Sequence, residues 1–456
     1  MLVDRKKRPE SFGEIRFTVP EIQTTTLNNK LKIFFGEKKD LPIIRINFVV
    51  NSGSCFDPKN SKGLSNLLSM CIDEGAGKFN SLQLADEFEM LGAQFSAGAD
   101  SDLIVISLQV LTENFVPALK IFKSVVIDPH LNEEDFNREK RKVLVRLNQL
   151  KMEPDYVADI SFEYLLFGQD CPYAFPVIGK EKDIQSIQHQ FVRDFYYQKF
   201  TPLNSALIIV GNIGFDSLYK TLNEEFSSWI NVQPDSQQDL LVKKSQKKIY
   251  LVNKPDSVQT EIRTGHLTTK RDQNDFFQKQ ILNLILGGQF SSRLNLNLRE
   301  KHGYTYGVHS SFNYFKDAGY YSVSTSVDTE NTTNALKEVF SELKKIKDGI
   351  TKEELDFAKS SLVKRFPSNF ETYRQIASNI GSKVFHNLPD DYFETYIQKI
   401  NSLSSDDVNS ISQTAFRQDE LTTILVGDTD KILDQLRKED FDEVETLEYE
   451  KLFNHS

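Results

Sequence analysis

The chain has no long apolar segment. No stretch of its 456 residues approaches the roughly 18 consecutive apolar residues of a membrane-spanning helix, so the sequence excludes a transmembrane helix. The first ten residues, MLVDRKKRPE, are charged without an apolar stretch behind them, which is not the pattern of a secretory signal. We expect a cytoplasmic protein, although a periplasmic chain trimmed of its signal would read the same.

Positive charge is also scarce. The 55 lysines and arginines are outnumbered by 65 aspartates and glutamates, which gives a net charge of −10. Phosphate binding needs clustered cations, so this balance argues against a nucleic-acid partner. The basic cluster at 243–248 lies beside serine and glutamine and is typical of a solvated linker.

Cysteine and histidine are too few and too scattered for most metal or nucleophile motifs. The three cysteines are widely spaced, which predicts neither a disulfide framework nor a zinc knuckle. The seven histidines form no i,i+4 pair, and His302 and His309 are better explained as loop or strand residues than as ligands. The sequence also lacks a G-x-S-x-G motif and a phosphate-binding loop.

What the chain does contain is an internal repeat. The pattern TENxxxALK at 112–120 recurs at 329–337, and each copy follows an alternating apolar run, at 103–110 and 320–327. Alternation predicts a strand, and the amphipathic pattern after the turn predicts a helix. Strand, turn and helix in the same order in both halves predict a duplicated unit.

Other segments match in the same order. The helical patterns at 131–147 and 350–366 both begin with a polar cap and an acidic first turn. The apolar strands at 206–211 and 422–427 both end in Val-Gly. These matches strengthen the prediction of two homologous α+β domains.

Between the halves, residues 231–247 are polar and carry a proline, and we predict the linker there. The first domain is then 1–230 and the second 248–456. Each half mixes a few strands with long helices, so we predict the α+β class. Each domain would be an antiparallel-rich mixed sheet with helices packed on one face. Two such domains would form a clam-like pair with a cleft between them, where ligand sites are common.

Short motifs carry a family resemblance. They include Gly63-Leu64-Ser65, Asp73-Glu74-Gly75-Ala76 and, most specific of all, LREKHGYTYG at 298–307. With these motifs the chain, from about Phe17 to about Gly427, resembles the pitrilysin/insulinase family of zinc metallopeptidases. The resemblance implies the fold of its short two-domain subunits, and peptide hydrolysis as the activity of the complete enzyme.

The resemblance also implies that the zinc site is lost. Active members carry His-x-x-Glu-His directly after the position of residues 63–65, but here Asn66, Ser69 and Met70 stand for the first His, the general base and the second His. The third ligand, a glutamate, falls on Arg146. A catalytic zinc needs three N, O or S donors and a base, and a permanent guanidinium cation repels a metal. We therefore expect no cofactor in this chain and zinc in a partner.

A second implied site is retained. Family members of this design use an Arg and a Tyr seven residues apart to hold the carbonyl of the peptide bond to be cleaved, and Arg299 and Tyr306 match that pair. Both side chains are hydrogen-bond donors that stabilise the negative charge of the transition state. Arg293 is expected to be structural, and the spacing favours Tyr306 over Tyr304.

The resemblance then implies a subunit that hydrolyses nothing by itself. Its partner would be a zinc-bearing homologous subunit with His-x-x-Glu-His, and the substrate an unfolded peptide paired along an edge strand of that partner. The alternative is a structural or peptide-binding pseudo-peptidase without a role in catalysis, like the family-derived scaffold subunits of respiratory complexes. A homodimer of the isolated chain is compatible with both interpretations.

Overall fold

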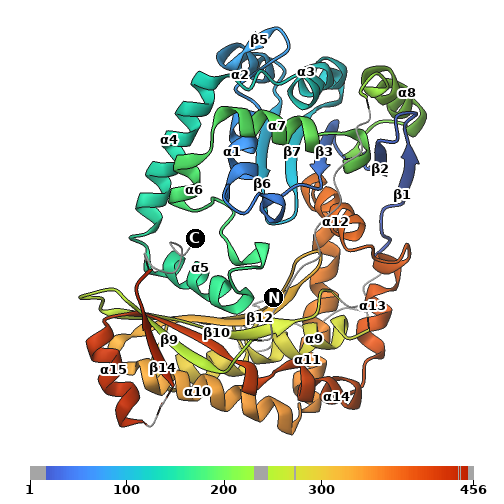
Figure 1. The fold of residues 1–456 in the computed structure, drawn as a ribbon. Coiled ribbons are helices and arrows are strands. Elements are labelled where there is room, and N and C mark those ends of the chain that lie inside the picture. Colours follow the sequence, from blue (N-terminus) through green and yellow to red (C-terminus); the bar gives the residue numbers. More distant parts are fainter. Residues whose placement is uncertain (1–16, 231–244, 272–273, 440, 442, 450–456) are drawn as a thin grey trace, which may run out of the picture.

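The computed structural model describes residues 17–230, 245–271, 274–439, 441 and 443–449. The chain folds around two six-stranded sheets, each with its own group of helices (Figure 1). Most of the predicted linker, residues 231–244, lies outside the described residues, so the domain boundaries remain a prediction. None of the helices in the described part of the chain is long and apolar enough to cross a membrane.

The first sheet has the strand order β1-β2-β8-β3-β7-β6 and is antiparallel except for the pair β2 and β8. A short hairpin of β4 and β5 lies apart from it. The strands of this half are β1 (Ile22–Thr26), β2 (Lys32–Glu37), β3 (Ile43–Val50), β4 (Gly75–Ala76), β5 (Phe79–Asn80), β6 (Gln94–Ala99), β7 (Ile104–Leu111) and β8 (Ser205–Gly211).

The second sheet has the order β11-β12-β10-β13-β9-β14, with β9 parallel to both β13 and β14. Five strands in a row correspond between the sheets, because β6-β7-β3-β8-β2 matches β11-β12-β10-β13-β9. Its strands are β9 (Lys248–Asn253), β10 (Gln259–Thr268), β11 (Val308–Tyr314), β12 (Gly319–Asp328), β13 (Thr422–Gly427) and β14 (Val444–Leu447). The predicted antiparallel-rich mixed sheets are confirmed, while duplication of the unit remains a prediction.

The helices also follow the predicted order. Both TENxxxALK segments form a 3₁₀ turn, Thr112–Asn114 and Thr329–Asn331, that leads directly into a helix. Those of the first half are α1 (Leu64–Cys71), α2 (Ser81–Met90), α3 (Phe115–Ile127), α4 (Glu133–Leu150), α5 (Pro154–Phe167), α6 (Glu181–Ser186), α7 (His189–Lys199) and α8 (Phe215–Phe226). Those of the second half are α9 (Phe276–Leu286), α10 (Thr332–Lys345), α11 (Lys352–Arg365), α12 (Tyr373–Phe385), α13 (Tyr392–Ser402), α14 (Ser405–Ala415) and α15 (Thr429–Lys438).

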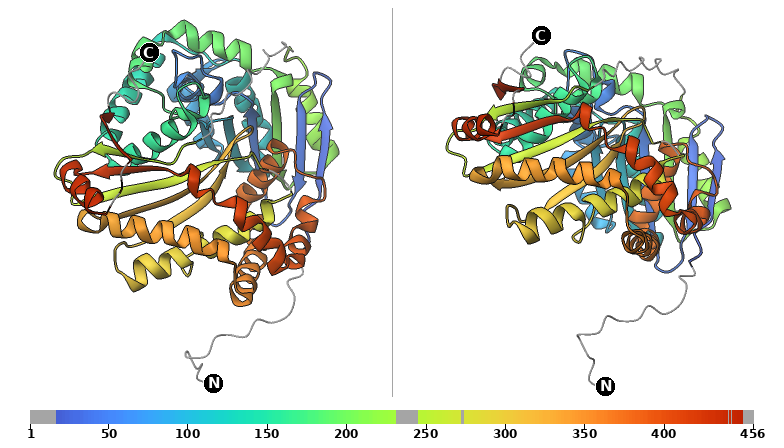
Figure 2. Two further views of the ribbon diagram at one scale, coloured as in Figure 1. Left: turned by 60° about the horizontal axis from the view of Figure 1, so that its bottom comes forward. Right: turned by 90° about the horizontal axis from the view of Figure 1, so that it is seen from below.

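Each sheet packs its own helices against one face, as predicted, but the other face is covered as well. Helix α5 of the first half lies on β10 and β13 of the second sheet, and α12 of the second half lies on β8 and β3 of the first (Figures 1 and 2). We call the face that the other half's helix covers the inner face of each sheet. The two halves therefore complete each other's cores.

Apolar side chains explain this exchange. In α5, Phe162 is buried together with Ile424 and Val426 of β13. In α12, Ile376 and Ile380 are buried with Ile208 and Val210 of β8. A strand with apolar residues on both faces is typical of a sheet covered on both sides, and β8 and β13 are buried at every position.

The tip of the β11–β12 hairpin fixes the two halves to each other. Phe315 stacks on Tyr173 of the first half with ring centroids 4.3 Å apart. The Lys316 N–H donates to Asp102 Oδ2 at 3.2 Å, and the Tyr173 hydroxyl donates to Asp102 Oδ1 at 2.6 Å. A stacked aromatic pair and a shared carboxylate therefore join segments that are far apart in the sequence.

A partly buried carboxyl group in this interface makes stability depend on pH. Burial raises the pKa of Glu163 in α5 from 4.5 to about 7, although the Tyr320 hydroxyl of β12 donates to its Oε1 at 2.9 Å and so lowers it. The folded chain thus keeps this proton to a higher pH than the unfolded chain. We expect the contribution of Glu163 to stability to be lost as the pH rises from about 4.5 to about 7.

The measurement is the melting temperature between pH 5 and pH 8. For Glu163→Gln, which cannot ionise, we expect a smaller decrease over this range than for the wild type. Glu21 is exposed, and Glu21→Gln is the control that should leave the wild-type slope unchanged. Equal slopes in the wild type and Glu163→Gln would contradict the prediction.

Candidate functional site

The helix that corresponds to the zinc helix of active family members begins at an intact cap. Gly63, immediately before α1, has a positive φ of 98° and lies so close to Gly179 that no larger residue fits. The Asp57 carboxylate accepts the N–H groups of Gly63 at 2.7 Å and Ser65 at 2.8 Å. Burial raises the pKa of Asp57 to about 7, while these two hydrogen bonds lower it. Gly63 and Asp57 therefore fix the start of α1 independently of the residues at 66–70.

The three replaced positions on α1 contact one another. The Asn66 amide lies 3.8 Å from the sulfur of Met70, and the Ser69 hydroxyl donates to the Asn66 carbonyl oxygen at 2.8 Å. Ser69 is buried, and Met70 packs against the first core. Their polar atoms are used within the helix, and no group of three His, Cys, Asp or Glu side chains suited to a metal occurs among the described residues.

Helix α4 packs on α1 and carries Glu139 and Arg146. Glu139 is buried, and its carboxylate accepts from Arg138 at 3.1 Å and Lys142 at 2.8 Å. Arg146 is half-exposed and lies 3.3 Å from the carboxylate of Glu153 beyond the helix end. Arg146 therefore extends its charge into solvent, where Glu153 partly neutralises it, and repels a metal on α1 less directly than a buried cation would.

In the second half, Arg299 lies in a π-helical turn, Asn295–Lys301. Asn295 fixes this turn to the start of β11, because its side chain donates to the Val308 carbonyl at 2.7 Å and accepts the Val308 N–H at 3.0 Å. The Arg299 guanidinium lies 4.0 Å from the ring centroid of Phe290 and is about one-third exposed. Glu300 is its nearest carboxylate, at 3.6 Å.

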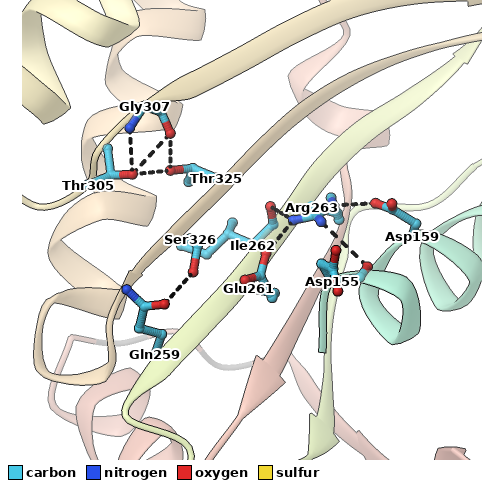
Figure 3. Close-up of polar contacts among 10 residues, drawn as sticks. All are labelled: Asp155, Asp159, Gln259, Glu261, Ile262, Arg263, Thr305, Gly307, Thr325 and Ser326. Carbon is cyan, nitrogen blue, oxygen red and sulfur yellow. Dashed lines mark hydrogen bonds and ion pairs between the residues drawn. The ribbon is translucent and has the colours of Figure 1, made fainter. Parts of the chain in front are cut away.

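Tyr306 lies in the loop that follows, and 94% of it is exposed. The residues on either side of it are held firmly. The Gly307 N–H donates to Thr305 Oγ1 at 3.1 Å, and the hydroxyls of Thr305 and Thr325 lie 2.9 Å apart, each 3.0 Å from the Gly307 carbonyl oxygen (Figure 3). A fixed backbone thus presents a tyrosine that has almost no contact with the rest of the chain.

The other candidate residues near Arg299 and Tyr306 have different surroundings. Tyr304 packs against the second core and stacks on His302. Arg293 forms a two-point ion pair with Glu354 at 2.6 and 2.8 Å, at the start of α11. His309 is exposed on β11. Of the tyrosines and arginines in 293–306, Arg299 and Tyr306 are therefore the ones presented to solvent without a core or bidentate partner.

Sequence reasoning missed the polar groups on the inner faces of the sheets. Arg263 of β10 is buried and pairs with Asp159 of α5 at 2.5 Å and with Glu261 at 2.9 Å (Figure 3). Burial alone would lower the pKa of Arg263, but Asp159 and Glu261 raise it overall. Arg45 of β3 is buried in the corresponding strand. A charged residue inside an apolar strand pattern could have revealed Arg45 in β3, whereas the largely polar sequence of β10 carries no such signal for Arg263.

Comparison with known proteins agrees with the fold. Residues 37–166 match the family described as "Insulinase (Peptidase family M16)", and residues 186–362 match "Peptidase M16 inactive domain". The first match lies within the first half, the second begins near the end of the first half and extends into the second half, and together they span most of the chain. The chain belongs to the M16, or pitrilysin/insulinase, family of peptidases, as a short two-domain member without His-x-x-Glu-His.

Among curated relatives, "Non-peptidase homolog YmxG" of Helicobacter pylori is 24% identical over 88% of this chain and 93% of that protein. "Uncharacterized zinc protease YmxG" of Bacillus subtilis is 21% identical over 87% of this chain and 96% of that protein. Among solved structures, the "peptidase M16 inactive domain" from Pseudomonas fluorescens has a TM-score of 0.84 at 26% identity, covering 90% of this chain and 98% of that one. These similarities support a catalytically inactive M16-like subunit.

The loss of the zinc site predicts the metal content. One equivalent of zinc is added to the protein, and unbound metal is then removed by dialysis against metal-free buffer. We expect less than about 0.1 zinc per chain to remain, because α1 and α4 offer no set of three donors. The measurement is elemental analysis by mass spectrometry. A variant with Asn66→His, Met70→His and Arg146→Glu is the matched comparison and should retain more zinc. Stoichiometric zinc in the wild type would contradict the prediction.

Proposed function

We propose that this chain is the non-catalytic subunit of a two-chain zinc peptidase. A homologous subunit with His-x-x-Glu-His supplies the zinc and the general base. This chain closes the chamber around the substrate and supplies Arg299 and Tyr306 to hold the carbonyl of the peptide bond being cleaved. The substrate is an unfolded peptide.

The exposure of Tyr306 is the observation that carries this proposal. A tyrosine that is 94% exposed contributes little to the core, yet Thr305 and Gly307 on either side of it are hydrogen-bonded to Thr325 of β12. The backbone around Tyr306 is thus held rigidly, although its side chain has almost no contact within the chain. This arrangement suits a side chain that acts on another molecule.

Arg299 fits the same role. Phe290 lies under the guanidinium plane and restricts its position, while the hydrogen-bond donors at the guanidinium edge have no bidentate carboxylate partner among the described residues. Because Phe290 is 67% exposed and Leu296, in the same turn as Arg299, is 52% exposed, this surface also has the apolar area that a partner subunit could cover.

A longer protein of the same fold shows that a unit like this one can be one part of a larger assembly. The periplasmic protease PqqL from Escherichia coli has the same fold over 93% of this chain, at a TM-score of 0.75 and 16% identity, but the matched part is 49% of its length. A unit like this one therefore accounts for about half of that longer protein. We propose that a separate zinc-bearing chain takes the place of the other half here.

The test is cleavage of an unstructured peptide by a mixture of this chain and a zinc-bearing homologue. Neither chain alone is expected to cleave at the rate of the mixture. Arg299→Ala and Tyr306→Phe should each lower the rate of the mixture by about 10²-fold, the usual cost of losing one donor to a developing oxyanion.

Matched controls separate catalysis from assembly. Arg437→Ala on α15 and Tyr197→Phe on α7 change exposed residues of the same types and should leave the rate unchanged. Binding of each variant to the zinc-bearing chain should equal that of the wild type. If the mixture is active but Arg299→Ala and Tyr306→Phe are as active as the wild type, the chain is a scaffold subunit and the proposed roles are wrong.

A further inference from the structure

One buried amide joins the turn that carries Arg299 to the strand that follows Tyr306. Asn295 begins this π-helical turn, and only 5% of it is exposed. Its Nδ2 donates to the Val308 carbonyl oxygen at 2.7 Å, and its Oδ1 accepts the Val308 N–H at 3.0 Å. A side chain that pairs with both backbone groups of one strand residue takes the place of a neighbouring strand at that point. The segment between residues 295 and 308 is therefore closed at both of its ends.

The same amide is also held by its own side of this closure. Its Nδ2 lies 3.1 Å from the Ser292 hydroxyl and 3.3 Å from the Gln289 carbonyl oxygen. Ser292 is 1% exposed, so this part of the turn is enclosed. A buried amide with partners on two segments resists rotation, because another orientation would leave polar groups without partners. Asn295 therefore fixes both the distance and the orientation of the turn relative to β11.

A second buried amide ties the turn to α10. Asn297 donates from Nδ2 to Glu338 Oε2 at 2.7 Å and to Glu342 Oε1 at 2.8 Å. The next residue, Leu298, is buried in the second core, and the partly exposed Arg299 follows it directly. Single π-helical turns are uncommon and occur frequently at functional sites. The turn thus has a fixed place on the second half, and Arg299 takes its position from the turn.

The loop that carries Tyr306 is anchored on either side. Before Tyr306, the hydroxyls of Thr305 and Thr325 lie 2.9 Å apart, and Thr325 is 5% exposed on β12 (Figure 3). After Tyr306, the Asn295 amide holds both backbone groups of Val308. Since these bonds reach backbone groups on either side of the phenol, the influence of Asn295 on Tyr306 passes through the backbone.

We propose that Asn295 is a positioning residue for the pair Arg299 and Tyr306. It sets the separation of the guanidinium and the phenol, so that both donors can reach one carbonyl oxygen. The inference rests on the proposed function, in which these two side chains hold the carbonyl of the peptide bond. Groups at such a site must be held within about 0.5 Å of the productive geometry, and a misplacement of about 1 Å can cost on the order of 10²-fold in rate.

The experiment compares Asn295→Ala with the wild type in the mixture with a zinc-bearing homologue. We expect kcat for cleavage of the unstructured peptide to fall about tenfold or more. KM and binding to the zinc-bearing chain should stay unchanged, because donors that act on the transition state contribute little to binding of the peptide itself.

Asn204 in the first half offers a matched control. Its amide also donates to backbone carbonyl oxygens, to that of Lys199 at 3.0 Å and to that of Asn51 at 3.4 Å. Asn204→Ala therefore removes the same kind of buried bonds far from the turn in sequence, and it should leave kcat unchanged. A similar fall in kcat for both alanine variants would contradict a specific role of Asn295.

Combining the changes separates positioning from a merely structural role. If Asn295 acts through Arg299 and Tyr306, Asn295→Ala should lower kcat less than about twofold in a chain that already carries Arg299→Ala and Tyr306→Phe. In that chain no pair remains to be positioned, so the effects are not additive. A general loss of structure would lower kcat by the same factor in both chains. Equal factors in the two chains would overturn the proposal.

Hydrogen exchange of the free chain tests the geometry without catalysis. At a temperature where the variant is folded, Asn295→Ala should increase amide exchange in residues 303–308 at least about tenfold, and Asn204→Ala should not. If Asn295→Ala does not fold, Asn295→Asp takes its place. An ionised aspartate has the same shape and accepts the Val308 N–H, but it cannot donate to the Val308 carbonyl oxygen. Unchanged exchange in residues 303–308 would overturn the proposal.

The positioning role and the proposed function can be told apart when one of them fails. If Arg299→Ala and Tyr306→Phe lower the rate but Asn295→Ala does not, the proposed function stands and the positioning role is wrong. If Arg299→Ala and Tyr306→Phe leave the rate unchanged, the proposed function is wrong and the positioning role falls with it, whatever the exchange of residues 303–308 shows.

Discussion

The exchange of α5 and α12 between the two halves is the constraint on which the rest of the structure depends. Each six-stranded sheet can cover one face with its own helices, but the second face would remain exposed and apolar along β8 or β13. Burial of such a face is the main source of stability in a sheet of this size. Since the helix that covers it comes from the other half, neither half has a complete core by itself. The stacking of Phe315 on Tyr173 adds a further contact between the halves.

Core packing also explains how α1 keeps its place although it lacks the His-x-x-Glu-His motif. Leu64, Leu67 and Leu68 of α1 are buried in the first core, and the Asp57 cap holds the start of the helix. α1 packs in the core without His or Glu at these positions, because the Ser69 hydroxyl is bonded within the helix and Met70 packs against the first core. A helix that the core requires can therefore lose its catalytic residues and keep its place. What remains available for function is on surfaces that the core does not need, such as the turn that carries Arg299 and Tyr306.

The sequence predicted the elements and their order better than their contacts. The TENxxxALK repeat located a strand, a turn and a helix in each half because those signals are local and periodic. The replacement of the zinc ligands was also visible, because it concerns residue types at fixed spacing. The exchange of α5 and α12 was not predicted, since a helix that packs on a distant sheet has the same periodicity as one that packs nearby. The direction of the Arg146 side chain could not be predicted either, because it depends on side-chain geometry and not on the spacing of residues. In the structure Arg146 pairs with Glu153.

The two buried arginines carry the argument one step further. A structure gains nothing from a desolvated cation unless a neighbouring group compensates it, and Arg263 shows that this fold can supply two carboxylates at such a position. Arg45 is buried to the same degree, but its Nε has no hydrogen-bond partner among the described residues. The two inner faces are therefore asymmetric, because among the described residues carboxylates pair with the buried cation of the second half and not with that of the first. The exchange of helices therefore joins α5 to the second sheet by an ion pair as well as by apolar contacts, whereas the contacts of α12 with β8 among the described residues are apolar.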